Sequence, residues 1–187
     1  MPKKYNRSQE EGNNRCGGYA LDSLLYDMGI INNPMPLQTY KGIQDEQLAI
    51  VNDAASQKLL DSTRQNETNF SFPSAIVYYF FKVSKQLPKV TIDQMMLENY
   101  YPVHIINDET QRINKISVKV EKDTLKEVLN NQNNHRHLVL TNNGTHWISV
   151  VKDNGSLYMY DPGVGGFKVI QIQDLEKMYS GIVITLD

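Results

Sequence analysis

Three residues of this chain, Cys16, His146 and Asp161, have the side-chain types that thiol catalysis requires. Such catalysis needs a thiolate nucleophile, a base that generates it and a group that orients the base. Cys16 is the only cysteine among the 187 residues. If the three side chains meet, the chemistry they support is attack of the sulfur on an acyl carbon, with His146 moving the protons.

Each of these residues also has an ordinary structural explanation. A lone cysteine is most often a small buried apolar residue. His146 fits a strand, and Asp161 begins an Asp-Pro-Gly turn sequence. The catalytic interpretation therefore depends on whether the elements around the three residues bring them together.

Cys16 falls where a helix is predicted to begin. Gly29 occupies the position of a glycine C-cap, and Asn13 or Asn14 can cap the start. A cysteine in the first helical turn lies near unpaired N–H groups and the positive end of the helix dipole, which stabilise its anion. The helix is predicted from one apolar stripe, formed by Cys16, Ala20, Leu21, Leu24, Leu25 and Met28.

His146 and Asp161 fall on a predicted hairpin. Asn154-Gly155 separates two apolar runs, residues 146–152 and 157–160, and Asn-Gly favours a two-residue hairpin turn. In that register Asp161 is the diagonal neighbour of His146 on one face of the sheet. A three-residue turn would place Asp161 on the opposite face, so the proposed pairing depends on the register.

The rest of the chain is predicted to form helices first and strands later, which indicates an α+β fold with an antiparallel C-terminal sheet. A helix is predicted to start at Ser71 and Pro73. This helix continues through the apolar run 75–83. The other predicted helices cover 43–60, 91–100 and 122–129, and the other strands cover 103–106, 116–120, 138–141, 169–172 and 182–186.

The motifs around the three residues resemble those of papain-like (CA clan) cysteine hydrolases. They are Asn14–Ala20, Thr145–Ile148 and Tyr160-Asp161-Pro162, and the histidine 130 residues after the cysteine fits the family spacing. The nearest resemblance is to bacterial effector protein-glutamine deamidases and papain-fold effector proteases, over about residues 13–29 and 138–167. It implies a papain-like fold with Cys16 as nucleophile, His146 as base and acid, and Asp161 orienting His146.

The oxyanion donor is the part of the family pattern that this chain alters. Many relatives carry a glutamine six residues before the cysteine, whereas Gln9 stands seven before Cys16. Asn13 and Asn14 are alternative donors, acting with the Cys16 backbone N–H. Because loss of one such donor typically costs roughly 3–4 kcal/mol of transition-state stabilisation, we expect one of the three to fill the role.

The amino-acid composition excludes several classes of function and partner. A net charge of −2 gives no electrostatic reason to expect nucleic acid or an anionic membrane as partner. One cysteine excludes an internal disulfide framework and Cys-based metal sites, and no apolar run is long enough to span a bilayer. We expect one monomeric domain over residues 1–187, with residues 1–13 as a flexible leader, no secretory signal, no cofactor and no metal. His135 and His137 are expected in a solvated loop.

Two hydrolytic activities share the predicted chemistry. The leading hypothesis is a protein-glutamine deamidase of the effector type, and the alternative is a cysteine protease with the same triad. A non-enzymatic binding module on the same fold is a third hypothesis. The expected partner of either enzyme is a protein substrate, possibly of a host. A reactive thiol needs a reducing setting, so the expected location is a cytoplasm, either the cell's own or that of a host receiving a secreted effector.

Overall fold

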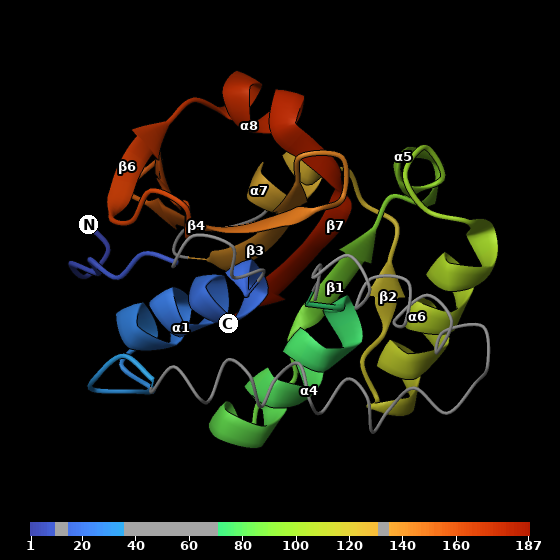
Figure 1. Cartoon of the computed structure of the whole chain (residues 1–187), viewed down its shortest axis with the longest axis horizontal. Coiled ribbons are helices and arrows are strands. Elements are labelled where there is room, and N and C mark those ends of the chain that lie inside the picture. The colour runs from blue at the N-terminus through green and yellow to red at the C-terminus, as the bar shows by residue number, and fades with distance from the viewer. Residues whose placement is uncertain (10–14, 36–70, 131–134) are drawn as a thin grey trace.

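The computed structural model describes residues 1–9, 15–35, 71–130 and 135–187, and Figure 1 shows their arrangement. The predicted helix over 43–60 lies outside these residues. The elements in chain order are α1 (Cys16–Met28), α4 (Pro73–Ser84), β1 (Lys89–Ile92), α5 (Gln94–Leu97), α6 (Val103–Lys115), β2 (Val120–Glu121), α7 (Leu125–Asn130), β3 (Arg136–Thr141), β4 (His146–Asp153), β5 (Ser156–Tyr160), β6 (Phe167–Ile170), α8 (Ile172–Met178) and β7 (Tyr179–Leu186).

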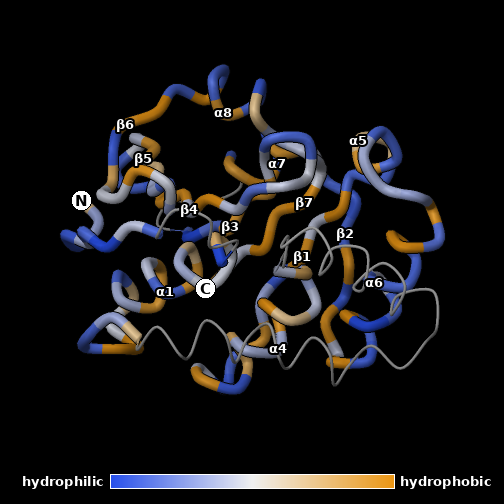
Figure 2. The backbone as a smooth tube through the Cα atoms, viewed as in Figure 1, coloured by the Kyte–Doolittle hydropathy of each residue, from blue (hydrophilic) through white to orange (hydrophobic). Residues whose placement is uncertain are grey.

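The strands form one seven-stranded sheet in the order β2-β1-β7-β3-β4-β5-β6. Only β1 and β2 are parallel, and the other neighbours are antiparallel. β7 lies inside the sheet, is buried along its whole length and carries hydrophobic colour in Figure 2. Two hydrophobic clusters cover the sheet, one with α1 and α4 and the other with α7 and α8. The α+β prediction is therefore confirmed.

Helix α1, which begins at the cysteine, is the best buried helix of the described chain. Residues 16–25 are all buried, including the polar Asp22 and Ser23. Tyr5 donates a hydrogen bond to Asp22, and the Ser23 hydroxyl lies 2.5 Å from the Ser149 hydroxyl on β4. Because buried polar groups are costly unless paired, these contacts fix α1 against the sheet in one orientation.

The hairpin of β4 and β5 has the register that the sequence predicts. Asp153 pairs with Ser156 and Ser149 with Tyr160 around the Asn154-Gly155 turn. Asn154 and Gly155 both have positive φ, as this tight turn requires. The ladder ends at Tyr160, so Asp161 follows directly on the last paired residue.

The middle of the chain differs from the prediction in two places. Residues 103–106, predicted as a strand, form the first turn of α6, with Ile105 and Ile106 on its buried side. In the predicted helix over 91–100, Thr91 and Ile92 pair with β7 and only Gln94–Leu97 is helical. A short apolar run fits a buried strand or a buried helix equally well, and here the tertiary contacts decide.

Smaller differences concern strand ends and the start of the chain. Where a strand is predicted over 116–120, the structure has only the short strand Val120–Glu121. The strand predicted over 169–172 lies two residues earlier, at Phe167–Ile170. At residues 1–9, in the predicted flexible leader, Tyr5 is only 2% exposed and packs edge-to-face on Tyr160. The start of the leader therefore contacts the domain. Within the described ranges, no helix is both long and apolar enough to cross a bilayer.

Candidate active site

Cys16 is the first residue of α1 and is 3% exposed. The N-cap of α1 is Arg15, whose side chain makes no capping hydrogen bond. The prediction that Asn13 or Asn14 caps this helix is therefore wrong. Asn13 and Asn14 themselves lie outside the described residues. Gly17 leaves room for Ser71, because a Cβ at position 17 would collide with the Ser71 side chain. The glycine at position 17 therefore lets Ser71 pack closely against the start of α1, next to Cys16.

His146 is the first residue of β4, and its ring is bonded to the residue that follows β5. His146 Nε2 lies 2.9 Å from Asp161 Oδ1. The Gly163 backbone N–H also donates to Oδ1, at 2.8 Å, which holds the carboxylate in place. With Nε2 engaged by Asp161, Nδ1 is the ring nitrogen left for Cys16.

The charges at the site favour a protonated imidazole. Burial alone lowers the pKa of His146, but hydrogen bonds with Asp161 and Cys16 outweigh it and raise the pKa to about 9. The same hydrogen bond from His146 holds the pKa of Asp161 below its ordinary value. Since a pKa of about 9 leaves His146 charged at neutral pH, a cation lies beside the sulfur, as an activated thiol requires.

A fourth group at the site, the Trp147 backbone, is absent from the sequence prediction. The Trp147 N–H points at Cys16 Sγ, with 3.4 Å between nitrogen and sulfur. The Trp147 side chain is buried on the α1 side of the sheet and donates through Nε1 to the Ser71 carbonyl, at 2.8 Å. The strand therefore supplies a main-chain donor that stabilises negative charge on the sulfur. No sequence signal identifies it, because every residue but proline has such a donor.

Tyr101 is a second neighbour that sequence analysis does not identify. Its hydroxyl donates to the Gly144 carbonyl in the turn that precedes His146, and a Cβ at Gly144 would lie 2.6 Å from the Tyr101 ring. Burial, followed by the charges of Cys16 and Glu109, raises the pKa of Tyr101 to about 12. Tyr101 thus stays neutral and supports the β3–β4 turn close to the cysteine.

Gln9 is the one oxyanion candidate within the described residues. Its backbone N–H donates to the Pro162 carbonyl at 2.6 Å, one residue beyond Asp161. The side-chain Oε1 is buried and has no hydrogen-bond partner. An unpartnered buried amide oxygen is uncommon in proteins. No hydrogen bond to Oε1 therefore holds the Gln9 amide in a structural role.

The two histidines expected in a solvated loop occupy other surroundings. His137 is buried in β3, where Nδ1 lies 3.0 Å from the Thr185 hydroxyl, and burial lowers its pKa to about 3. His135 Nδ1 lies 2.5 Å from Asp187 Oδ1. The loop prediction is wrong for His137, because residues 136–141 form a central strand. His135 lies outside helix and strand, directly before β3, but it is partly buried rather than fully solvated. Among the described residues no group of three or more His, Cys, Asp or Glu side chains is placed to hold a metal ion.

The helix that begins at a cysteine, packed on an antiparallel sheet that carries the histidine, defines a papain-like cysteine protease fold. The solved double glycine motif protease from an AMS/PCAT transporter, in complex with the leader peptide, is similar to this chain at a TM-score of 0.50 and 13% identity, over 98% of this chain and 91% of that one. The Pseudomonas avirulence protein AvrPphB is similar at a TM-score of 0.39 and 14% identity, over 96% and 94%. No protein-family model and no curated protein matches the sequence.

Proposed function

We propose that this protein is a cysteine peptidase in which Cys16, His146 and Asp161 form the catalytic triad. Two hydrogen bonds at the start of β4 carry the proposal: His146 Nε2 lies 2.9 Å from Asp161 Oδ1, and the backbone N–H of the next residue, Trp147, donates to Cys16 Sγ. Neither hydrogen bond follows from the fold alone, because the first needs a histidine and an aspartate and the second needs a cysteine. The position of Cys16 at the start of α1 adds the N–H groups of the first helical turn.

The proposed reaction assigns one task to each group. The Cys16 thiolate attacks the peptide carbonyl carbon, and the protonated His146 gives its proton to the departing amine. A water molecule, deprotonated by the now neutral His146, then releases the acyl group as a carboxylate and restores the thiol. Asp161 holds the imidazole in position throughout. The Gln9 side chain and the Cys16 backbone N–H are the proposed donors to the oxyanion.

A peptide bond is better supported as the substrate than a glutamine carboxamide. The solved protein of similar fold is named a protease and was captured with a leader peptide. Nothing in the described part of the site singles out a glutamine side chain. The same triad could release ammonia from glutamine, so the deamidase of the sequence analysis stays as the second activity to test. In either case we propose a protein or peptide partner and a reducing compartment, such as the cytoplasm of the cell or of a host.

Mass spectrometry of candidate proteins and a peptide library after incubation distinguishes these activities. The proposal predicts new chain termini that require Cys16 and are absent with Cys16→Ala or His146→Ala, each of which should lower turnover by a factor of about 10³ or more. A gain of one dalton at glutamine without new termini would establish the deamidase instead. Cleavage that persists in Cys16→Ala would contradict the triad.

A further inference from the structure

Asp161 belongs to the loop that joins β5 to β6, residues 161–166, and not to the sheet itself. The loop is folded around this residue: the Gly165 N–H donates to the Asp161 carbonyl at 2.8 Å, and the Gly163 N–H donates to its carboxylate. The hairpin register brings Asp161 to His146, but the strand ladder stops before the loop begins. The hydrogen bond between the two side chains therefore depends on what holds the loop.

Residues 5–9, which we call the brace, bind the chain on both sides of the triad aspartate; Figure 1 shows them in dark blue near the N-terminus. The Tyr160 hydroxyl donates to the Arg7 carbonyl at 2.9 Å. The Gln9 N–H donates to the Pro162 carbonyl at 2.6 Å. Since Tyr160 directly precedes the aspartate and Pro162 directly follows it, a displacement of the brace would move the main chain that carries the carboxylate.

The far end of the loop also packs on the brace. A Cβ at Gly165 would lie 3.3 Å from Ser8 Cβ and 3.4 Å from the Arg7 carbonyl oxygen. The brace therefore occupies the space beside Gly165. Because the Gly165 N–H is bonded to the Asp161 carbonyl, a push at Gly165 is passed on to Asp161.

The brace itself is anchored on the buried part of the domain. Tyr5 is 2% exposed and donates a hydrogen bond to the buried Asp22 of α1. Its ring packs edge-to-face on Tyr160, with 5.1 Å between the ring centroids. Lys3, just before the brace, donates its N–H to Asp27 of the same helix at 2.7 Å. The brace therefore connects the helix that begins at the nucleophile with the loop that carries the aspartate.

We propose that the brace positions Asp161 for the reaction and that Tyr160, whose hydroxyl holds the brace, is a positioning residue. Tyr160 acts through Asp161, by keeping its carboxylate at hydrogen-bond distance from the His146 ring. Because a misplacement of about 1 Å can cost roughly a hundredfold in rate, a loop with this task needs a support outside itself. The inference rests on the proposed peptidase function and adds residues outside the triad on which its chemistry depends.

Tyr160→Phe tests the brace without disturbing the core, because it keeps the buried ring and removes only the hydroxyl. A loosened loop weakens the hydrogen bond from His146 to Asp161, which helps to raise the pKa of His146 to about 9. We expect this pKa to fall by about half a pH unit or more in the variant. NMR titration of the His146 ring C–H resonance, assigned by its absence in His146→Ala, measures it.

Tyr158→Phe is the matched control for Tyr160→Phe. Tyr158 lies two residues earlier on β5 and therefore on the same face of the strand, where it is partly buried. Its hydroxyl makes no hydrogen bond to the brace in the described part of the chain. The pKa of His146 should keep its wild-type value in this variant.

Two neighbouring glycines test the brace from the side of the loop. Gly165 and Gly166 have nearly the same positive φ, 77° and 72°, so alanine strains the backbone alike at both positions. A Cβ at Gly166 has no other atom within 4 Å, whereas one at Gly165 presses on Ser8 and Arg7. We expect the pKa of His146 to fall in Gly165→Ala and to stay unchanged in Gly166→Ala.

Turnover provides a second readout. On a peptide that the library identifies as a substrate, Tyr160→Phe should lower kcat by roughly tenfold and leave KM nearly unchanged, because the orientation of the imidazole matters in the transition state. The alkaline limb of kcat/KM should move to lower pH together with the pKa of His146. A rise in KM alone would contradict a role through Asp161.

The His146 titrations separate the brace from the peptidase. An unchanged pKa in both Tyr160→Phe and Gly165→Ala would overturn the brace, and a wild-type value near 9 would then leave the triad intact. Equal falls in a variant and its control would also overturn the brace, because general loosening would explain them. A wild-type His146 that titrates near 6.5 and does not respond to Cys16→Ala would contradict the proposed function itself.

Discussion

The two sides of the candidate site are built in different ways. On the sheet side, His146 begins β4 and Asp161 directly follows β5, and a two-residue turn joins these strands, so 15 residues of sequence set their relation. On the helical side, the contacts join distant parts of the chain: Trp147 with Ser71, 76 residues apart, and Glu109 with Ser74, 35 residues apart.

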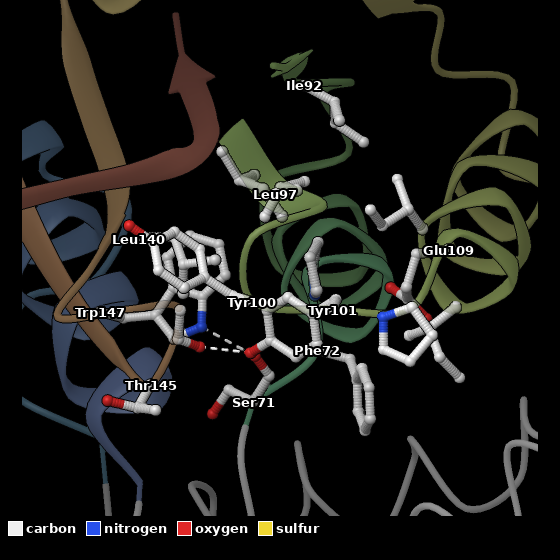
Figure 3. Close-up of a pocket in the computed structure, with 16 residues that line it drawn as sticks. Ser71, Phe72, Ile92, Leu97, Tyr100, Tyr101, Glu109, Leu140, Thr145 and Trp147 are labelled. Carbon is white, nitrogen blue, oxygen red and sulfur yellow. Dashed lines mark hydrogen bonds between the residues drawn. The ribbon is translucent and has the colours of Figure 1, made fainter. Parts of the chain in front are cut away.

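This difference separates two properties of the molecule. The sheet side carries the groups proposed to move protons, and local turn chemistry defines it. The helical side forms the far wall of the cavity that lies between the sheet and α6 (Figure 3), and buried polar contacts between elements define this side. We therefore expect that changes on the helical side mainly alter stability, whereas changes on the sheet side alter the chemistry.

The largest loss of stability is expected from Glu109→Ala. Glu109 is buried, accepts two hydrogen bonds from Ser74 at the start of α4 and pairs with the buried Arg112. Removing one partner of a buried ion pair typically costs roughly 3–5 kcal/mol. The free energy of unfolding in urea should fall by about that amount, while the labelling rate of Cys16 by iodoacetamide in the folded protein stays unchanged.

Glu127→Ala is the matched control for Glu109→Ala. Glu127 accepts hydrogen bonds from the Thr124 N–H and hydroxyl, the same pair of donors that Ser74 offers to Glu109, but it is fully exposed. Its removal should reduce the free energy of unfolding far less. Equal losses in the two variants would contradict the role given to burial on the helical side.

Gln9→Ala tests the proposed oxyanion donor on the sheet side. Loss of one such donor typically costs about 10²–10³ in turnover. We expect kcat to fall by that factor with little change in KM, because the donor acts on the transition state. Gln94→Ala, at an exposed glutamine of α5, is the control and should retain full activity. A wild-type kcat in Gln9→Ala would leave the role to Asn13 or Asn14.

Asp161→Asn should change the pH dependence of the reaction. The hydrogen bond that His146 donates to Asp161 helps to raise the pKa of His146 to about 9, so its weakening moves that pKa back towards 6.5. Since the imidazolium must protonate the leaving amine, the alkaline limb of kcat/KM should move to lower pH, by about one to two units. Asp174→Asn removes an exposed carboxylate paired with Lys177 and should leave the pH profile unchanged. An unshifted limb in Asp161→Asn would contradict the orienting role.

The sheet side was largely predictable because its signals are local. Asn154-Gly155 defines the hairpin register, and the register places Asp161 beside His146. The apolar stripe after Cys16 and the glycine at position 29 likewise define α1, whose C-cap Gly29 has the left-handed conformation. In each case neighbouring residues determine the backbone, and one residue type suits the required φ.

The helical side was not predictable, because its contacts join residues that are far apart in the sequence. Ile105 and Ile106 belong to an apolar run too short to show a helical period, and only their packing against the sheet identifies α6 as a helix. Ser71 also packs against Gly17, and Tyr101 against Gly144, and no spacing in the sequence indicates these two contacts. Tyr5 is a similar case, since a single aromatic in a polar segment gives no sign that it packs on Tyr160.

The central claim is that His146 activates Cys16. The most direct measurement is the second-order rate of Cys16 alkylation by iodoacetamide between pH 5 and pH 10, in the wild type and in His146→Ala, with exposed His104→Ala on α6 as control. If His146 activates the thiol, we expect fast alkylation at pH 6–7 in the wild type and in His104→Ala, and at least a tenfold slower rate at that pH in His146→Ala. Identical pH–rate profiles in all three proteins would contradict it.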